Sequence, residues 1–499
     1  MTKLGIFVAA AVITALPITL ANAQSGTFRQ SHDVGFGEDV IDVDPASEGR
    51  FWQVTEKVMS RLVRPGESGK PEPNLATEWS ANDDATEWIF KLRDGVKFHD
   101  GSDFDADDVV YTLEHVRDPE FDSAAAAVFG MVDTIEAVDR LTVKMTLSAP
   151  YADLPLQLMD YRIRMIPEGS ADTIAKTGIG TGPFILVTLD PGGTTVLKAN
   201  PDYWEGPPGV ETVEIIGIPD TQARVQALLS GQIDMLGYGD LSGQQLALFE
   251  NNPKFKVHSV ATGDWQGIVF RTDVEPYTDA RVRKALRIAT DRQAMVDLVL
   301  GPGGGVVTCD HPVWSGDQYR APFDCPQQID EAKRLLAEAG YPNGIEIDVT
   351  TSDLRATWID IVQVYQQQVA QAGIKVNLVK APADGYWSEV WMKESAVTTS
   401  WGQRPADQIL NEDYRGGAPW NETYWNRADF DDLLDQAREE LDFDKRKALY
   451  HRLQRILYEE GGSFIPFHIN QAVATTARVS GLQPVFTDAV RYHLIHVSD

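Results

Sequence analysis

The chain has 499 residues, and its 74 Asp and Glu against 44 Lys and Arg give a formal net charge of −30 at pH 7. This excess of acids argues against nucleic acid or an anionic membrane as a partner, and it favours a freely diffusing monomer. The length predicts two or three domains, at roughly 150 residues each, with ample hydrophobic core.

Residues 1–23 have the pattern of a secretory signal peptide. Lys3 precedes an apolar run over residues 4–13, and the Ala-Asn-Ala sequence at positions 21–23 fits a small-residue cleavage site. Pro17 and the neighbouring threonines end the apolar run far short of the roughly 20 residues that a membrane span needs. Since no cysteine lies near the cleavage site to carry a lipid, we expect a periplasmic protein without a lipid anchor.

Residues 87–116 predict a β-hairpin that leads into a capped helix. Apolar and polar side chains alternate over 87–92, and Asp94-Gly95 supplies a tight turn before the alternation resumes. Asp105 is in position to be the N-cap of a helix over residues 106–116, where apolar side chains recur at helical spacing.

The two cysteines, Cys309 and Cys325, lie in one loop rich in Pro, Gly and Asp. A secreted protein meets an oxidising compartment, and no third thiol competes, so we expect a disulfide between them. Two unpaired loop thiols are the alternative. A zinc site is not expected, because His311 is the only nearby histidine.

The second half of the chain predicts alternating strands and helices. Residues 345–349 and 374–379 alternate as strands, with a helical stretch over 357–372 between them, which is a βαβ unit with parallel strands. Amphipathic helices are predicted over 430–441 and 449–457. Their apolar faces are interpreted as core.

Six sequence blocks occur in an order and spacing that resemble those of the family 5 extracellular solute-binding proteins, the receptors for dipeptide, oligopeptide, nickel and opine ABC importers. The block over residues 87–116 carries most of the resemblance. The others are IDVDP at 41–45, GTGPF at 180–184 with NPDYW at 200–204, LLSGQIDM at 228–235, DARVRKALRIATDR at 279–292 and AKRLLAEAGY at 332–341.

The resemblance implies an α/β, two-lobed periplasmic binding protein fold (type II, cluster C) with an extra inserted subdomain. It implies a first lobe built from residues 24–61, 180–262 and 472–499, with the inserted subdomain at 62–179. The second lobe is expected over 263–471. Ligands of such proteins lie between the lobes, which close over them.

Five tryptophans fall between residues 386 and 425, and the predicted strand over 396–401 runs into the loop that follows Trp401. The carboxyl ends of strands are where open α/β sheets bind ligands, so this loop is the principal predicted site. In peptide-binding relatives an acid three residues after the loop tryptophan holds the ligand ammonium, and that position is Arg404 here. An arginine fork favours a carboxylate or phosphate instead. The predicted ligand-binding residues are Arg404, Trp401, Asp407, Trp387, Trp420 and Trp265.

Each of these residues has a structural alternative. Trp401 and Trp387 could belong to the core, because a buried strand end and one face of a short helix are both packed positions. Arg404 could pair with Asp407 and brace the loop without touching ligand. The role of Arg271 is left open.

The function expected from these patterns is that of a periplasmic receptor for a small polar organic solute, peptide-like or a carboxylated amino-acid derivative. It would deliver the solute to an ABC permease and its ATPase, without cofactor, metal or chemistry of its own. Phosphate-loop, nucleophile-elbow and zinc-protease motifs are not found in the sequence. The alternatives are an oligosaccharide or metal chelate on the same fold, or a secreted acidic glycosidase with paired carboxylates.

Overall fold

The computed structural model describes residues 26–33, 42–47, 51–66, 70–121, 123–237, 241, 243–250, 252–301, 303–483 and 490–498. The predicted signal peptide lies outside the described residues. Within the described part, no helix combines the length and apolar character needed to cross a membrane.

The first sheet has four strands in the order β1-β10-β9-β8. Their bounds are Thr27–His32 for β1, Thr212–Gly217 for β10, Thr194–Ala199 for β9 and Phe184–Thr188 for β8. Strand β1 pairs in parallel with β10, although some 180 residues separate them, and the other pairs are antiparallel. This sheet therefore joins the start of the chain to its middle.

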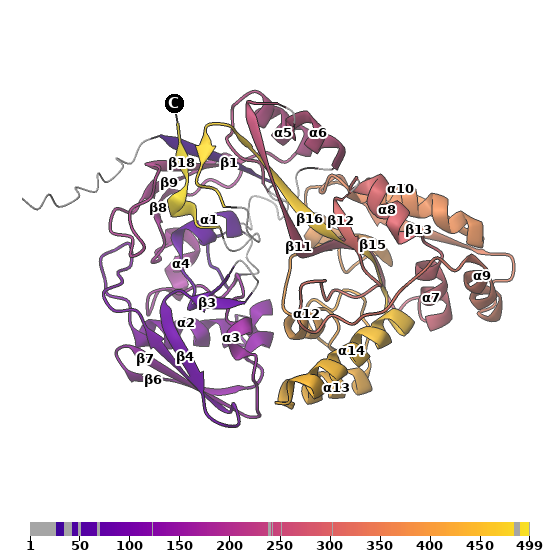
Figure 1. Cartoon of the computed structure of the whole chain (residues 1–499), viewed down its shortest axis with the longest axis horizontal. Coiled ribbons are helices and arrows are strands. Elements are labelled where there is room, and N and C mark those ends of the chain that lie inside the picture. Colours follow the sequence, from indigo (N-terminus) through magenta and orange to yellow (C-terminus); the bar gives the residue numbers. More distant parts are fainter. Residues whose placement is uncertain are drawn as a thin grey trace, which may run out of the picture.

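The second sheet has six strands in the order β12-β16-β11-β15-β13-β14. Their bounds are Gly305–Val307 (β12), Ser463–Thr476 (β16), Phe255–Phe270 (β11), Ala396–Trp401 (β15), Ile345–Thr351 (β13) and Ile374–Lys380 (β14). The long strands β11 and β16 run from beside α5 and α6 into the half of the molecule that carries β13 and α10 (Figure 1). Their register shifts between Ala261 and Trp265, and the predicted boundary at 262/263 falls inside this shift.

The third sheet, β4-β5-β7-β6, belongs to the predicted inserted subdomain. Its strands are Ala76–Ala81 (β4), Glu87–Leu92 (β5), Thr142–Leu147 (β7) and Val132–Asp139 (β6). The predicted hairpin is wrong in its pairing. The turn at Asp94-Gly95 is present, but both edges of β5 are occupied by β4 and β7, so residues 96–98 do not pair with it. The capped helix is confirmed as α2, Ala106–Arg117, with a capping box formed by Asp105 and Asp108.

The helices pack against these sheets and one another. Their bounds are α1 Trp52–Val58, α3 Leu154–Gln157, α4 Ala171–Thr177, α5 Thr221–Leu229, α6 Gly243–Glu250, α7 Ala280–Ile288, α8 Arg292–Val299, α9 Ile329–Glu338, α10 Trp358–Val369, α11 Tyr386–Glu389, α12 Ala406–Asp413, α13 Ala428–Glu439 and α14 Phe443–Glu460. The other described strands are short: β2 Val63–Pro65, β3 Pro71–Pro73, β17 Val479–Ser480 and β18 His496–Val497. The parallel β13-α10-β14 unit is confirmed, as are the two amphipathic helices, α13 and α14.

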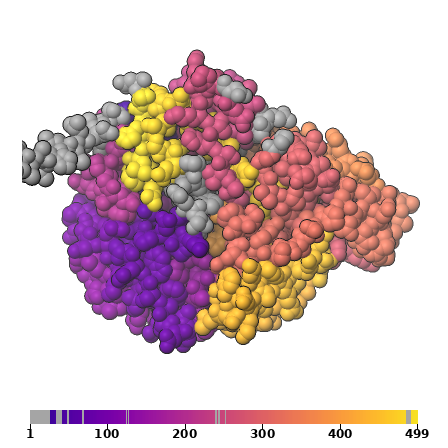
Figure 2. All heavy atoms as spheres, viewed as in Figure 1, coloured from indigo at the N-terminus to yellow at the C-terminus, as the bar shows by residue number. Residues whose placement is uncertain are grey.

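Separate hydrophobic cores support the sheets. One core surrounds the third sheet and includes Phe90 and Leu113, whereas another surrounds the second sheet and includes Trp358 and Phe464. On the molecular surface, the indigo inserted subdomain meets the orange and yellow part of the chain along a seam (Figure 2). The two parts can therefore fold around their own cores and meet at that seam.

Candidate ligand-binding site

A cavity of about 480 Å³ lies at the seam between residues 62–179, the predicted inserted subdomain, and the second half of the chain. The inserted subdomain contributes Trp79, Trp88 and the segment 152–161. The opposite wall is formed by residues of the loops 314–319 and 403–408. The cavity is thus built from segments that are far apart in the sequence.

The loop 402–405 is positioned by β15, whose residues are mostly buried because the strand lies inside the second sheet. Trp401, its last residue, is paired across the ladder with Trp265 of β11. The chain then turns, and α12 begins at Ala406 with Asp407 in its first turn. An acid in this position is favoured by the helix dipole.

Arg404 lines the cavity but its guanidinium is engaged inside the same wall. Its Nε lies 2.8 Å from Oε2 of Glu412 in an ion pair, and Nη1 donates to the carbonyl of Gly402 at 3.0 Å. The alternative pairing of Arg404 with Asp407 is wrong, because α12 brings Glu412 to the guanidinium and turns Asp407 towards other partners. Ligand contact by Arg404 stays a prediction.

Asp407 is the centre of a buried network. Nε of Arg438 donates to both of its carboxylate oxygens at 2.9 and 3.0 Å. The hydroxyls of Tyr450 and Tyr151 donate at 2.9 and 2.8 Å. Because Tyr151 belongs to the inserted subdomain, this network crosses the seam. The prediction that Asp407 contacts ligand remains untested, and its oxygens already accept these bonds.

A second buried network crosses the seam beside the first. Nη2 of Arg162 lies 2.6 Å from Asp160 and 2.5 Å from Glu412. Burial alone would raise the pKa of Asp160, but the charge of Arg162 outweighs it and holds that pKa below the usual range. Sequence reasoning missed this arrangement, because no periodicity or motif connects residues about 250 positions apart.

The predicted tryptophans are not among the described residues that line the cavity. Trp265 and Trp401 are buried, with ring centroids 6.5 Å apart. Trp420 packs edge-on against Trp401 at 5.5 Å. Trp387 packs on Trp358 at 5.5 Å in the core of the second sheet. Their ligand contacts stay predictions. In this structure they pack on other aromatic rings, and the guanidinium groups of Arg162 and Arg404 lie over Trp420 and Trp401.

A buried carboxylate that sequence reasoning missed lies among these rings. Glu422 accepts hydrogen bonds from the indole nitrogens of Trp391 and Trp401 and from the hydroxyl of Thr399. Burial raises its pKa to about 7. Glu422 therefore gains and loses a proton near neutral pH inside the tryptophan cluster.

Another missed pair joins the first strand to the second half of the chain. Arg355 forms an ion pair with Asp33, which directly follows β1. The role of Arg271 is also visible: its guanidinium pairs with Asp273 at 2.7 Å and donates to the carbonyl of Lys393 at 3.1 Å. Arg271 therefore joins neighbouring loops.

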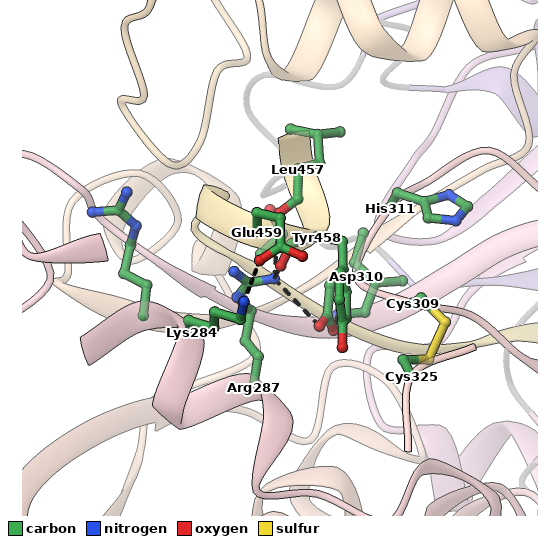
Figure 3. Close-up of polar contacts among 12 residues, drawn as sticks. Lys284, Arg287, Cys309, Asp310, His311, Cys325, Leu457, Tyr458 and Glu459 are labelled. Carbon is green, nitrogen blue, oxygen red and sulfur yellow. Dashed lines mark hydrogen bonds and ion pairs between the residues drawn. A yellow bond between two sulfur atoms is a disulfide. The ribbon is translucent and has the colours of Figure 1, made fainter. Parts of the chain in front are cut away.

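In the structure, a disulfide bond joins Cys309 to Cys325. Figure 3 shows Asp310 next to this bond, with Arg287 directed towards its carboxylate; the two are 3.3 Å apart. The loop closed by the disulfide carries residues 314–319 of the cavity wall. Burial lowers the pKa of the adjacent His311 well below its usual value, so this imidazole is neutral.

The described residues around the cavity do not form a ligand set for a metal ion. Within the ranges that the structure describes, no group of three or more His, Cys, Asp or Glu side chains is arranged to hold an ion. What the cavity offers is a set of carboxylates, amides and aromatic rings suited to binding a polar organic molecule.

The chain is similar to proteins of known function and structure. A sequence model of bacterial extracellular solute-binding proteins, family 5 Middle, matches residues 70–441. Heme-binding protein A of Haemophilus influenzae is 27% identical over 449 residues, covering 81% of this chain and 80% of that protein. Glutathione-binding protein GsiB of Shigella dysenteriae is 28% identical over 495 residues, covering 94% of both.

A solved structure shares the fold. The periplasmic binding protein DppA of Helicobacter pylori, in complex with the peptide STSA, matches with a TM-score of 0.83 at 22% identity, over 95% of this chain and 99% of that chain. The expected two-lobed α/β fold is thereby confirmed.

Proposed function

Since the chain belongs to family 5 of the bacterial extracellular solute-binding proteins, we propose that it captures a small polar organic solute between its lobes and delivers it to an ABC permease. The permease and its ATPase are separate chains. The solute-binding chain carries out no reaction on its cargo.

The observation that carries this proposal is the cavity at the seam, flanked by buried polar contacts that cross from one side to the other. Asp407 accepts from Tyr151 across the seam, and Arg162 pairs with Glu412 across it. Such contacts exist only while the two sides are together. They therefore stabilise a closed form that a ligand in the cavity selects.

The lobes are proposed to move about the shift in strand register between Ala261 and Trp265, where β11 and β16 leave regular pairing. The parts proposed to move are a first lobe, the subdomain inserted in it, and a second lobe. The first lobe consists of residues 24–61, 180–262 and 472–499, the inserted subdomain of 62–179, and the second lobe of 263–471. A short irregularity in two long strands is a place where a hinge can absorb changes in φ and ψ.

The compartment is part of the proposal. Residues 1–23 direct export to the periplasm, cleavage after Ala23 leaves a chain that begins at Gln24, and the mature protein works there as a monomer without lipid. Mass spectrometry of the periplasmic fraction tests the start of the chain, and a membrane-bound or unprocessed product would contradict it.

The identity of the solute can be tested on the periplasmic protein as purified. Mild denaturation should release the copurified compound, which mass spectrometry then identifies. Calorimetry with the identified compound should give one site per chain, and small-angle scattering should show a smaller radius of gyration with it bound. Turnover of sugar substrates, without stoichiometric binding, would favour a glycosidase instead. Tight binding with an unchanged scattering curve would contradict lobe closure.

A further inference from the structure

Most charges on the cavity wall are neutralised by partners within the protein. Arg404 is paired with Glu412. Asp407 is paired with Arg438, and Asp160 is paired with Arg162. Lys70 lies exposed at the rim. These groups therefore leave little net charge for a ligand to meet inside.

The carboxylates of Asp317 and Asp153 differ from these paired groups, because no cation in the described ranges lies close enough to balance their charge fully. Asp317 accepts two backbone bonds, from Tyr319 at 2.8 Å and Ala406 at 3.0 Å, and the described part of the chain gives it no ion pair. Asp153 accepts from the hydroxyl of Tyr319 at 2.7 Å, and its cationic neighbour, Arg446, is 3.7 Å away. Burial raises the pKa of Asp153, and it raises that of Asp317 to about 6, to which the charge of Asp153 contributes. Two incompletely balanced carboxylates, one from each wall, thus line the same cavity.

Gln157, on the wall that carries Asp153, supplies an independent observation. It is 1% exposed, and its Nε2 donates to Asp407 at 3.2 Å. That bond fixes the orientation of the amide, because a carboxylate can only accept. Its Oε1 is left without a hydrogen-bond donor among the described residues. A buried acceptor without a donor costs free energy, which a ligand N–H would recover.

The remaining wall is aromatic. Trp79, Trp314 and Tyr161 line the same cavity, and aromatic rings attract cations through their faces. Acidic, acceptor-rich and aromatic walls together match a positively charged group that also carries N–H donors.

We propose that the cavity binds the protonated amine or guanidinium group of its solute, with Asp317, Asp153 and the Oε1 of Gln157 as acceptors. This inference rests on the proposed solute-binding function and names the chemical class of its cargo. It reverses the expectation from Arg404, whose positive charge suggested an anionic ligand. The guanidinium of Arg404 is compensated by Glu412, whereas the acids are not compensated to the same degree.

Four capped amino acids can serve as probes that separate the effect of the ligand's positive charge from the effect of its N–H donors. N-acetyl-arginine amide and N-acetyl-citrulline amide have nearly the same shape and differ in charge. N-acetyl-lysine amide and its trimethylated form have the same charge, but the ammonium group of the trimethylated form has no N–H to donate. Calorimetry on ligand-free protein should show the arginine probe at least tenfold tighter than citrulline, and lysine tighter than trimethyl-lysine.

Substitutions test whether Asp317, Asp153 and Gln157 cause the preference for the cationic probes. Asp317→Asn should reduce the arginine preference to threefold or less, and Asp153→Asn, which keeps an acceptor for Tyr319, should weaken it in the same direction if Asp317→Asn folds poorly. Asp432→Asn, an exposed change on α13, is the matched control and should keep the preference. The lysine preference over trimethyl-lysine should become smaller in Gln157→Leu, because one of the three proposed acceptors is lost.

Equal binding of arginine and citrulline, or no binding by any of the four probes, would overturn the inference. The proposed function would still stand if a neutral or anionic solute bound tightly with lobe closure. It would fail separately if no compound of a broad library of peptides, amino-acid derivatives, sugars and chelates stabilised the protein.

Discussion

The hydroxyl of Tyr151 donates a 2.8 Å hydrogen bond to the carboxylate of Asp407, joining residues 256 positions apart across the seam of the molecule. Asp407 is held from its own side by Arg438 and Tyr450. The bond from Tyr151 is therefore received by a carboxylate that is already fixed in place. In the proposed closed form this network is complete, and opening the seam would take two donors, Tyr151 and Gln157, away from a buried charge.

Replacing Tyr151 by Phe should weaken ligand binding, because it removes this donor while the ring is kept. One hydrogen bond to a charged group, with the other partners of Asp407 retained, corresponds to about 1–2 kcal/mol, or roughly five- to thirtyfold in affinity. Calorimetry and scattering with the copurified solute measure the change. Tyr365→Phe, which removes a hydroxyl bonded to Leu286 within one core, should lower thermal stability without affecting ligand-induced compaction. Equal affinity in Tyr151→Phe and wild type would contradict the role assigned to this contact.

Replacing Arg404 by Ala should destabilise the ligand-free protein, because Glu412 loses one of its two cationic partners inside the wall. Breaking a buried ion pair costs about 3 kcal/mol, and urea unfolding measures it. Combining Arg404→Ala with Glu412→Gln should cost less than the sum of the two single changes, as expected for residues in contact. A large loss of affinity with unchanged unfolding would instead show that Arg404 contacts the solute.

The sequence predicted elements whose signals are local. Helix α2 was predicted from Asp105 and its apolar spacing, and the β13-α10-β14 unit from alternation around a helical stretch, since both depend on neighbouring residues. The hairpin failed because strand pairing is decided by which edges are free, and β4 and β7 occupy both edges of β5. Local sequence carries no information about that competition.

The site was predicted only in part for the same reason. The loop after Trp401 does line the cavity, because a strand end and its following loop are recognisable locally. The partners of Arg404 and Asp407 were not predictable, because Glu412, Arg438 and Tyr151 are selected by helix packing and by closure of the seam. The tryptophans that looked like a ligand wall pack together because large rings fill a core as readily as a pocket.

Glu422 should make the stability of the protein depend on pH. Burial raises its pKa from an ordinary value of 4.5 to about 7 in the folded state. The folded protein thus holds this proton more tightly, so the contribution to stability is fully present below about pH 4.5 and is lost as pH rises through 7. Unfolding followed from pH 5 to pH 8 should show this loss in wild type and a smaller one in Glu422→Gln.

Tryptophan fluorescence provides a second measurement of the same group. Because Trp391 and Trp401 donate to Glu422, ionisation of the carboxyl should change their emission with a midpoint near pH 7. Burial and the charge of Glu422 raise the pKa of the neighbouring Asp413 well above its usual value, so Glu422 ionises first, and Asp413→Asn should leave the midpoint near pH 7. A flat emission profile from pH 5 to pH 8 in wild type would contradict the assigned titration.

The disulfide between Cys309 and Cys325 should stabilise both the fold and the cavity wall. It closes a loop with a sequence separation of 16, for which the chain-entropy estimate is about 3 kcal/mol of unfolding free energy. The Cys309→Ser, Cys325→Ser double variant should lose about that amount in urea unfolding. Asp310 is paired with Arg287 and Arg292, as Figure 3 shows for Arg287. These pairs do not involve the sulfur atoms, so the base of the loop should remain in place in the variant.

Between that base and Cys325, the loop carries Trp314, Asp317 and Tyr319 to the cavity. Without the cross-link these side chains lose part of their preorganisation, and affinity for the copurified solute should fall, mainly through faster dissociation. Calorimetry and stopped-flow dissociation measure both effects, and thiol titration of the native wild-type protein should find no free thiol. Full affinity in a variant that has lost the expected stability would show that hydrogen bonds alone, such as Asp317 to Ala406, hold the wall in its binding geometry.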